Sequence, residues 1–258
     1  MTKDPNVLVA ENPVKQAKLA ASLFIRYARS TLLGKDHFDM VLPGGRTPAP
    51  FFRCLALEYA DAIDWSHVRF FWSDERDVPP EDPDSNFRLA NETLLKPLAI
   101  QADNIFRIPV GDKTKGAASA ADEYERTLRS LFGSTPAFDY VLLGIGEDGH
   151  TASLFPDARQ DWVTAEHEGH WVAAPWVPHL GARRITLLPR VLSEGIRVCF
   201  LVSGASKAAI LRELLRFDAD ARGHGRIPYP AQLIRSNSGK PFWLLDLAAA
   251  SRLTVHAA

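Results

Sequence analysis

One loop of the sequence carries side chains suited to acid–base chemistry. The apolar run 138–143 is followed by the sequence GIGEDGH, which ends at His150. A histidine can exchange protons near neutral pH, because its unperturbed pKa is about 6.5. Asp148 lies two residues before His150 and could orient its ring, as a general base requires. A surface histidine with a satisfied hydrogen bond would produce the same pattern, so these residues alone leave both interpretations open.

The glycines of this loop also form a G-x-G-x-x-G pattern, which occurs in dinucleotide-binding sites. Glu147 and Asp148 would then face the pyrophosphate with like charge, and the polar loop continues to Pro156 instead of opening a helix. We therefore reject NAD binding. The sequence also lacks the motifs of P-loops and of α/β-hydrolase nucleophile elbows. The segment HEGH does not have the H-E-x-x-H spacing of a zinc site, so we expect no metal.

A second loop could bind an anion through its backbone. The sequence PGGRTP (43–48) lies between an apolar run and a segment of helical period. Gly44 and Gly45 would allow a ligand to approach the backbone closely. Thr47 could cap the helix, whose first turn suits Pro48, and free N–H groups would then be available to an anion. A tight turn that binds no ligand explains these residues equally well.

Charged side chains follow two further apolar runs. The sequence SDERD, which includes Asp74 and Arg76, directly follows a buried strand, where core packing does not explain it. Lys207 opens a helix, where a cation opposes the helix macrodipole unless an anion lies beside it. Both groups could instead be solvated surface charges. Arg183 and Arg184 open another strand, and only one of them can face the site, because neighbouring strand residues point to opposite sides.

A regular scaffold must position these residues, and the sequence predicts an α/β one. Short apolar runs alternate with longer segments of helical period, which is typical of parallel strands joined by crossover helices. Such folds bind ligands at the carboxyl ends of their strands. We predict one three-layer α/β domain over residues 1–258. The predicted strands are 7–10, 38–42, 68–72, 104–108, 138–143, 171–174, 184–188, 197–202 and 242–245. The predicted helices are 13–33, 48–59, 86–95, 116–132 and 206–217, and the predicted loops include 78–85 and 157–169.

The composition argues against several classes of protein. The chain has 258 residues, of which 46% are hydrophobic and 24% are charged, and its formal net charge is −1. This balance gives no electrostatic reason to expect nucleic-acid binding. No uncharged apolar run approaches the ~18 residues of a membrane span, and we expect no signal peptide. Cys54 and Cys199 lie within apolar runs, so we expect buried thiols and a cytoplasmic location.

Five segments, in this order and with these spacings, closely resemble one enzyme family. They are LPGGRTP, FFWSDERDVPPEDPDSNFRLA, LLGIGEDGHTASLFP, RRITLLPRVL and VSGASKAAIL. The chain is similar to the 6-phosphogluconolactonases over nearly its whole length. The resemblance implies a Rossmann-like three-layer α/β/α fold with a mainly parallel sheet, like that of the glucosamine-6-phosphate deaminase and ribose-5-phosphate isomerase group. It also implies hydrolysis of 6-phosphoglucono-δ-lactone in the oxidative pentose phosphate pathway without a cofactor.

The resemblance also implies roles for individual residues. His150 matches the catalytic histidine, Asp148 its neighbouring carboxylate and Arg76 an active-site cation. The residues implied on the substrate and phosphate side are Gly44, Gly45, Arg46, Thr47, Asp74, Arg184 and Lys207. Pro43 stands where Ser or Ala is also common, and Arg46 where Ser is common, so backbone amides are favoured over hydroxyls as phosphate ligands. We expect a small-molecule substrate, no nucleic-acid or membrane partner, and a monomer or weak homodimer.

Two other functions are compatible with such a fold. The deaminases and isomerases of the same group resemble the chain around DGH, but they typically continue with IAFNEP and carry Tyr at the position of Arg76. Here TASLFP follows His150, which favours the lactonases. A sugar-phosphate sensor that regulates transcription would need a DNA-binding segment. We find neither spare length before the first strand nor a basic recognition helix.

Overall fold

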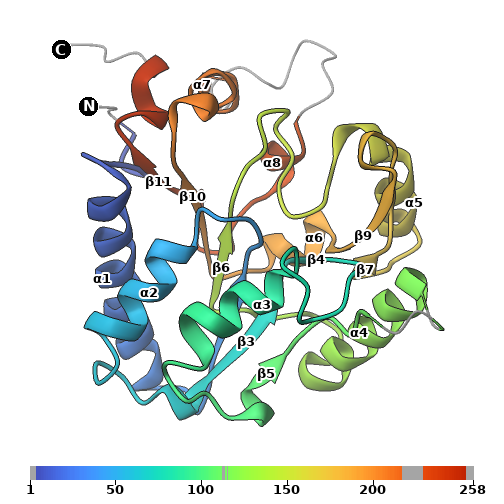
Figure 1. Cartoon of the computed structure of the whole chain (residues 1–258), viewed down its shortest axis with the longest axis horizontal. Helices are drawn as coiled ribbons and strands as arrows, with labels where there is room; N and C mark the ends of the chain where they lie inside the picture. Colours follow the sequence, from blue (N-terminus) through green and yellow to red (C-terminus); the bar gives the residue numbers. More distant parts are fainter. Residues whose placement is uncertain (1–3, 112–113, 115, 217–228, 254–258) are drawn as a thin grey trace.

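The computed structural model describes residues 4–111, 114, 116–216 and 229–253. A seven-stranded sheet forms its centre, in the order β1-β11-β10-β6-β2-β3-β5, and every neighbouring pair is parallel (Figure 1). The strands are β1 (Val7–Ala10), β2 (Phe38–Leu42), β3 (Val68–Trp72), β5 (Ile105–Phe106), β6 (Tyr140–Leu143), β10 (Arg197–Val202) and β11 (Phe242–Asp246). All positions of β2 and β6 are buried, which explains their continuous apolar runs. The predicted α/β fold with a mainly parallel sheet is confirmed.

Helices pack on both sides of this sheet. They are α1 (Pro13–Leu32), α2 (Ala49–Glu58), α3 (Asn86–Ala90), α4 (Gly116–Phe132), α5 (Arg159–His167), α6 (Pro189–Ser193), α7 (Ala208–Arg216) and α8 (Pro230–Leu233). Figure 1 shows α1 and α2 together on one side of the molecule and α4 and α5 on the other. The Phe24 ring of α1 contacts Phe38 and Tyr140 of the sheet, with centroids 5.5 and 5.3 Å apart. On α4, the hydroxyl of Tyr124 accepts from the backbone N–H of Trp72 at 3.0 Å and donates to its carbonyl at 3.1 Å.

A second, antiparallel sheet continues from the carboxyl end of β3. Its strands are β4 (Asp74–Arg76), β7 (Val172–Ala173), β8 (Trp176–Val177) and β9 (Ala182–Leu187). Residues 171–174 and 184–188, which we expect as strands of the parallel sheet, contribute to this small sheet instead. Residues 74–76, for which we predict no strand, form its β4. The prediction is wrong here because a local apolar pattern reveals a strand but not the strand with which it pairs.

Three predictions that concern helices also need correction. Residues 157–169 are expected as a loop but form a 3-10 turn (η4, Pro156–Ala158) and α5, whose helical period is weak because Trp162 is its one buried residue. Thr47 does not cap α2, since the cap position is Pro48 and no side chain bonds there. The predicted helix 86–95 is α3 followed by a π-helical turn (η2, Asn91–Leu95).

Two other predicted elements are shorter than expected. Strand 104–108 is reduced to β5, which follows a 3-10 turn (η3, Ala102–Asn104). Helix 206–217 begins with a 3-10 turn (η6, Ala205–Lys207) that leads into α7, and residue 217 lies outside the described residues. The remaining 3-10 turns are η1 (Trp65–His67), η5 (Pro178–Leu180) and η7 (Ala249–Arg252).

The core is continuous between the central sheet and its helices. Cys54 and Cys199 are both buried, as predicted. Burial raises the pKa of the Cys199 thiol to about 12, so this residue behaves as an unreactive part of the core. In the part of the chain that the structure describes, no helix has the length and apolar character needed to cross a bilayer.

Candidate active site

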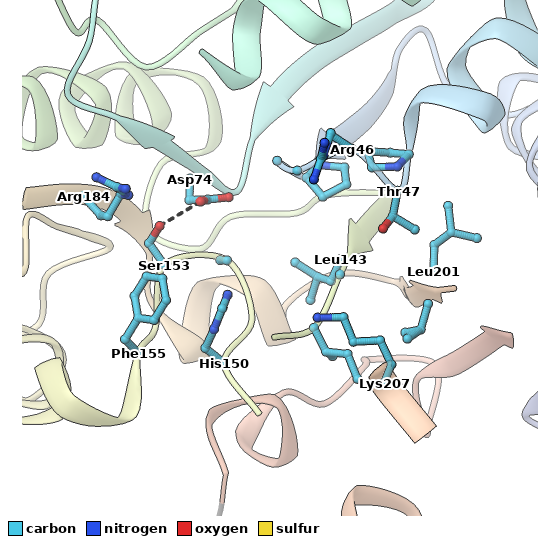
Figure 2. Close-up of a pocket in the computed structure, with 18 of the residues that line it drawn as sticks. Arg46, Thr47, Asp74, Leu143, His150, Ser153, Phe155, Arg184, Leu201 and Lys207 are labelled. Atoms are coloured by element: carbon cyan, nitrogen blue, oxygen red, sulfur yellow. Dashed lines mark hydrogen bonds between the residues drawn. The ribbon is translucent and has the colours of Figure 1, made fainter. Parts of the chain in front are cut away.

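A cavity of about 510 Å³ opens beyond the carboxyl ends of β2, β6 and β10 (Figure 2). These three strands are parallel neighbours, so the loops that follow them meet at one edge of the sheet. Asp148 is the one predicted site residue that does not border this cavity, and it contacts His150 instead. The predicted residues that border it are Gly44, Gly45, Arg46, Thr47, Asp74, Arg76, His150, Arg184 and Lys207.

His150 is held by Asp148 in the orientation expected of a general base. Its Nδ1 lies 2.6 Å from Asp148 Oδ1, and its backbone N–H donates to the same oxygen at 3.2 Å. In the neutral ring, Nδ1 therefore carries the proton and Nε2 keeps its lone pair. Burial raises the pKa of the Asp148 carboxyl, but the hydrogen bond and charge of His150 outweigh it, so this pKa lies below its ordinary value. Asp148 is thus ionised at neutral pH and fixes the tautomer of His150.

Gly146 leaves the space that this pair occupies. A Cβ at Gly146 would overlap with Nδ1 of His150 and Oδ1 of Asp148. The backbone N–H of Gly146 donates to the carbonyl of His150 at 2.8 Å, which closes the loop. The ring of Phe155 packs against the imidazole, with 4.1 Å between their centroids. The imidazole is therefore fixed both by a carboxylate and by an aromatic ring.

Asp74 joins the small sheet to the loop that carries His150. Its Oδ2 accepts from Ser153 Oγ at 2.7 Å and its Oδ1 accepts from Ser73 Oγ at 2.9 Å, and Figure 2 shows the first of these bonds. Asp74 borders the cavity as predicted, but both of its oxygens are already engaged by hydroxyl groups. The Ser153 hydroxyl donates to Asp74 and not to His150, so the described residues of this loop do not form a Ser–His pair.

Glu75 is a buried carboxylate that shapes the same segment, and sequence reasoning gave it no role. It accepts hydrogen bonds from the backbone N–H groups of Arg76, Asn86 and Phe87, each at 2.8 Å. Burial raises the pKa of Glu75 above its ordinary value, although these three N–H groups oppose the shift. Glu75 thereby ties β4 to the start of α3. Ser85 caps the same helix, since its Oγ accepts from the N–H of Arg88 at 3.1 Å.

Arg76 and Arg184 stand directly opposite each other in the small sheet. Like charges at such cross-strand positions repel. Burial, together with the positive charge of Arg76, lowers the pKa of Arg184 below its ordinary value. Arg183 is exposed and donates from Nη1 to the carbonyl of Ala174 at 2.7 Å, so Arg184 is the one of the two that borders the cavity. An anion bound near Arg76 and Arg184 would relieve their repulsion.

The glycine loop after β2 offers backbone donors to the same cavity. Within the described residues, the N–H groups of 44–47 donate to no backbone carbonyl. The main chain at Gly44 lies so close to Asn86 that a Cβ there would overlap the asparagine side chain. Gly45 has φ +77°, which favours glycine at the turn. The loop therefore has the form of an anion site, although its helix begins without the predicted threonine cap.

The cations of the site form two groups. Figure 2 shows Arg46, Thr47 and Lys207 on one side of His150 and Arg184 on the other. Among the described residues, Lys207 pairs with no carboxylate. We expect both Arg184 and Lys207 on the substrate and phosphate side, and the structure pairs Arg184 with Arg76 across the small sheet. The arrangement can activate a water molecule next to an anionic substrate that extends along the cavity.

Sequence reasoning missed four further residues with polar or aromatic side chains that border the cavity. They are Ser153, Phe155, His179 and Ser203. Three of them lie in loops that directly follow β6 and β10, so their position after a strand could have indicated them. His179 had no local signal, because its partner Asp157 lies 22 residues earlier in the chain. The described residues contain no group of three or more His, Cys, Asp or Glu arranged to hold a metal ion.

Comparisons with known proteins identify the family of this chain. A family profile described as "Glucosamine-6-phosphate isomerases/6-phosphogluconolactonase" matches residues 11–243. A 6-phosphogluconolactonase of Treponema pallidum is 34% identical over 87% of this chain and 90% of its own length. One of Haemophilus influenzae is 37% identical over 81% of this chain and 84% of its own. The crystal structure of 6-phosphogluconolactonase from Thermotoga maritima superimposes with a TM-score of 0.76 and 30% identity, covering 93% of this chain and 98% of that one. The chain therefore belongs to the glucosamine-6-phosphate isomerase/6-phosphogluconolactonase family.

Proposed function

We propose that this protein hydrolyses 6-phospho-D-glucono-1,5-lactone to 6-phospho-D-gluconate, in the oxidative pentose phosphate pathway. The observation that carries the proposal is the fixed imidazole of His150, with Nε2 free, in a cavity that four cationic side chains border. A basic nitrogen suits the activation of water, and the cations suit a phosphorylated substrate. The relatives named 6-phosphogluconolactonase support the same reaction.

The reaction proceeds by addition of water to C1 of the lactone. Nε2 of His150 takes one proton from the water as its oxygen bonds to C1, and the carbonyl oxygen becomes an oxyanion. The bond between C1 and the ring oxygen then breaks, and the proton on His150 passes to that oxygen. Water is the proposed nucleophile and no covalent intermediate is required, because a lactone is an activated ester and the nearby Ser153 hydroxyl is paired with Asp74 instead of His150.

The two groups of cations have different roles in this proposal. We assign Arg76 and Arg184 to the charge that develops on the C1 oxygen, where one well-placed donor is worth about 3 kcal/mol. This moves Arg184 away from the phosphate side, where the resemblance places it. The N–H groups of residues 44–47 and the ammonium of Lys207 bind the phosphate. Their binding energy orients the lactone ring against His150.

A lactonase assay tests the proposal directly. Freshly made 6-phosphoglucono-δ-lactone is mixed with the protein, and acid release is followed after subtraction of spontaneous hydrolysis. We expect rapid turnover of this substrate and a much lower kcat/KM for unphosphorylated glucono-δ-lactone. Glucosamine 6-phosphate is the control for the deaminase branch of the family and should release no ammonia. Ammonia release without lactone turnover would overturn the proposal.

Replacing Gly146 with alanine should lower activity by displacing the side chains beside it. In Gly146→Ala the new methyl group must displace the ring of His150 or the carboxylate of Asp148. We expect kcat to fall by about 10²-fold, since a displacement of about 1 Å at a reacting group has an effect of this size. Gly34→Ala is the matched control, because a Cβ there meets no atom within 4 Å. Equal kcat values for the two variants would show that the position of His150 is unimportant.

We further propose that residues 1–258 act as a single domain, as a monomer or weak homodimer in the cytoplasm. The continuous core supports the single domain. The buried thiols of Cys54 and Cys199 fit a reducing compartment. Sedimentation at micromolar protein concentration measures the oligomeric state. A stable assembly larger than a dimer would contradict the proposed monomer or weak homodimer.

A further inference from the structure

A second histidine–carboxylate pair lies beside His150. Nδ1 of His179 is 2.7 Å from Asp157 Oδ2, and the backbone N–H of His179 is directed at the same oxygen at 3.3 Å. Asp148 holds His150 through the same two groups. The ring of Phe155 contacts both imidazoles, with centroid separations of 4.1 Å to His150 and 5.2 Å to His179. Two fixed imidazoles therefore flank one buried phenyl ring.

His179 faces the cavity in which His150 acts. It lies in η5, directly before β9, which carries Arg184, and it borders the 510 Å³ cavity. Burial raises the pKa of Asp157, but the hydrogen bonds from His179 outweigh it and leave this pKa below its ordinary value. The ionised carboxylate holds the proton of the neutral ring on Nδ1. Nε2 lies on the other edge of the ring and bonds to none of the described residues.

Another half-exposed histidine beside a carboxylate, His170, provides a comparison within the chain. His170 lies 3.5 Å from Glu125, and its side chain is 47% exposed, against 49% for His179. The backbone N–H of His170 bonds to the carbonyl of Ala165 instead of that carboxylate, and His170 borders no part of the cavity. Fixing a half-exposed side chain costs rotamer entropy. The hydrogen bonds to Asp157 offset this entropy cost at His179. The fixed imidazole borders the cavity, where it can bind a ligand.

We propose that His179 is a specificity-determining residue that binds the C2 hydroxyl of the substrate through Nε2, and that Asp157 is its positioning residue. The inference rests on the proposed function, which places C1 at His150. The C2 hydroxyl is the group next to C1, and His179 is the imidazole next to His150, since both rings contact Phe155. A neutral imidazole accepts a hydrogen bond from a hydroxyl at Nε2. The site thereby selects lactones of 2-hydroxy sugar acids over their 2-deoxy counterparts.

Calorimetry with two ligands tests this assignment without turnover. The ligands are 6-phosphogluconate and 2-deoxy-6-phosphogluconate, and each is titrated into wild type, His179→Ala and the matched control His170→Ala. One hydrogen bond corresponds to a roughly five- to tenfold difference in affinity. We expect wild type and His170→Ala to prefer 6-phosphogluconate by this factor. His179→Ala should bind both ligands with equal affinity.

Further variants separate hydrogen bonding from loss of structure. His179→Gln, whose amide can reach the position of Nε2, should recover part of the preference. Asp157→Asn keeps an oxygen that can accept from Nδ1 and should retain most of it, whereas Asp157→Ala should lose it. Unfolding midpoints close to that of wild type establish that these exposed positions leave the fold intact.

The outcomes distinguish this inference from the proposed function. If His179→Ala still prefers 6-phosphogluconate over the 2-deoxy ligand as strongly as wild type does, the assignment of the C2 hydroxyl is overturned. It is also overturned if His170→Ala loses this preference as fully as His179→Ala does. Wild type that binds 6-phosphogluconate without any preference overturns the assignment but leaves the lactonase proposal standing. Wild type that binds neither ligand contradicts the proposed function itself.

Discussion

Replacing His150 with alanine is expected to lower kcat for the phosphorylated lactone by about 10²- to 10⁴-fold, the range typical of a general base. The variant loses the nitrogen that takes the proton from water, but it keeps the cations and backbone donors around the cavity. Its affinity for 6-phosphogluconate should therefore stay within about threefold of wild type. The Asp148 side chain is 43% exposed, so its carboxylate remains hydrated when the imidazole is removed.

Steady-state kinetics after subtraction of spontaneous hydrolysis measure the first quantity, and calorimetry measures the second. His170→Ala is the control, since it also removes an imidazole next to a carboxylate, but away from the cavity. Wild-type turnover in His150→Ala would refute the general-base assignment. A large loss of affinity with unchanged kcat would instead make His150 a binding residue.

Replacing Lys207 with alanine should lower kcat/KM for the phosphorylated lactone but not for the unphosphorylated one. A charged hydrogen bond contributes about 1.5–3 kcal/mol, so we expect kcat/KM for the phosphorylated lactone to fall by roughly 10- to 150-fold. The much slower hydrolysis of unphosphorylated glucono-δ-lactone should not change, because that substrate has no phosphate to bind. Among the described residues, Lys207 pairs with no carboxylate, so its removal leaves no unpaired charge behind.

The two substrates are compared in the same assay. Lys96→Ala, at an exposed position that does not border the cavity, is the control and should match wild type with both. An equal loss with the phosphorylated and the unphosphorylated lactone would show that Lys207 does not recognise the phosphate. It would point to a role near the reacting carbon.

The central sheet could be predicted from the sequence because its strands carry their own signal. The bounds of β1, β2, β3 and β10 agree with the predicted strands. Their apolar runs reflect burial on both faces, which is a local property of the chain. His150 and the loop 43–48 could be predicted for a related reason: each directly follows such a strand, and parallel strands bring their carboxyl ends together.

The rest of the site depends on contacts between distant segments. Arg184 faces Arg76 because β9 pairs with β4, and nothing near either residue indicates that pairing. Asp157 holds His179 across 22 residues, and its segment was expected to be a loop because α5 buries one side chain. Glu75 is recognisable as a ligand of three backbone N–H groups only when α3 is placed against β4.

A crystal structure of the protein with 6-phosphogluconate bound tests the central claim most directly. The account predicts that C1 lies beside His150, within reach of Nε2 through one water molecule, and that the phosphate contacts the N–H groups of residues 44–47 and Nζ of Lys207. A complex with C1 remote from His150, or with the ligand outside the 510 Å³ cavity, would contradict it.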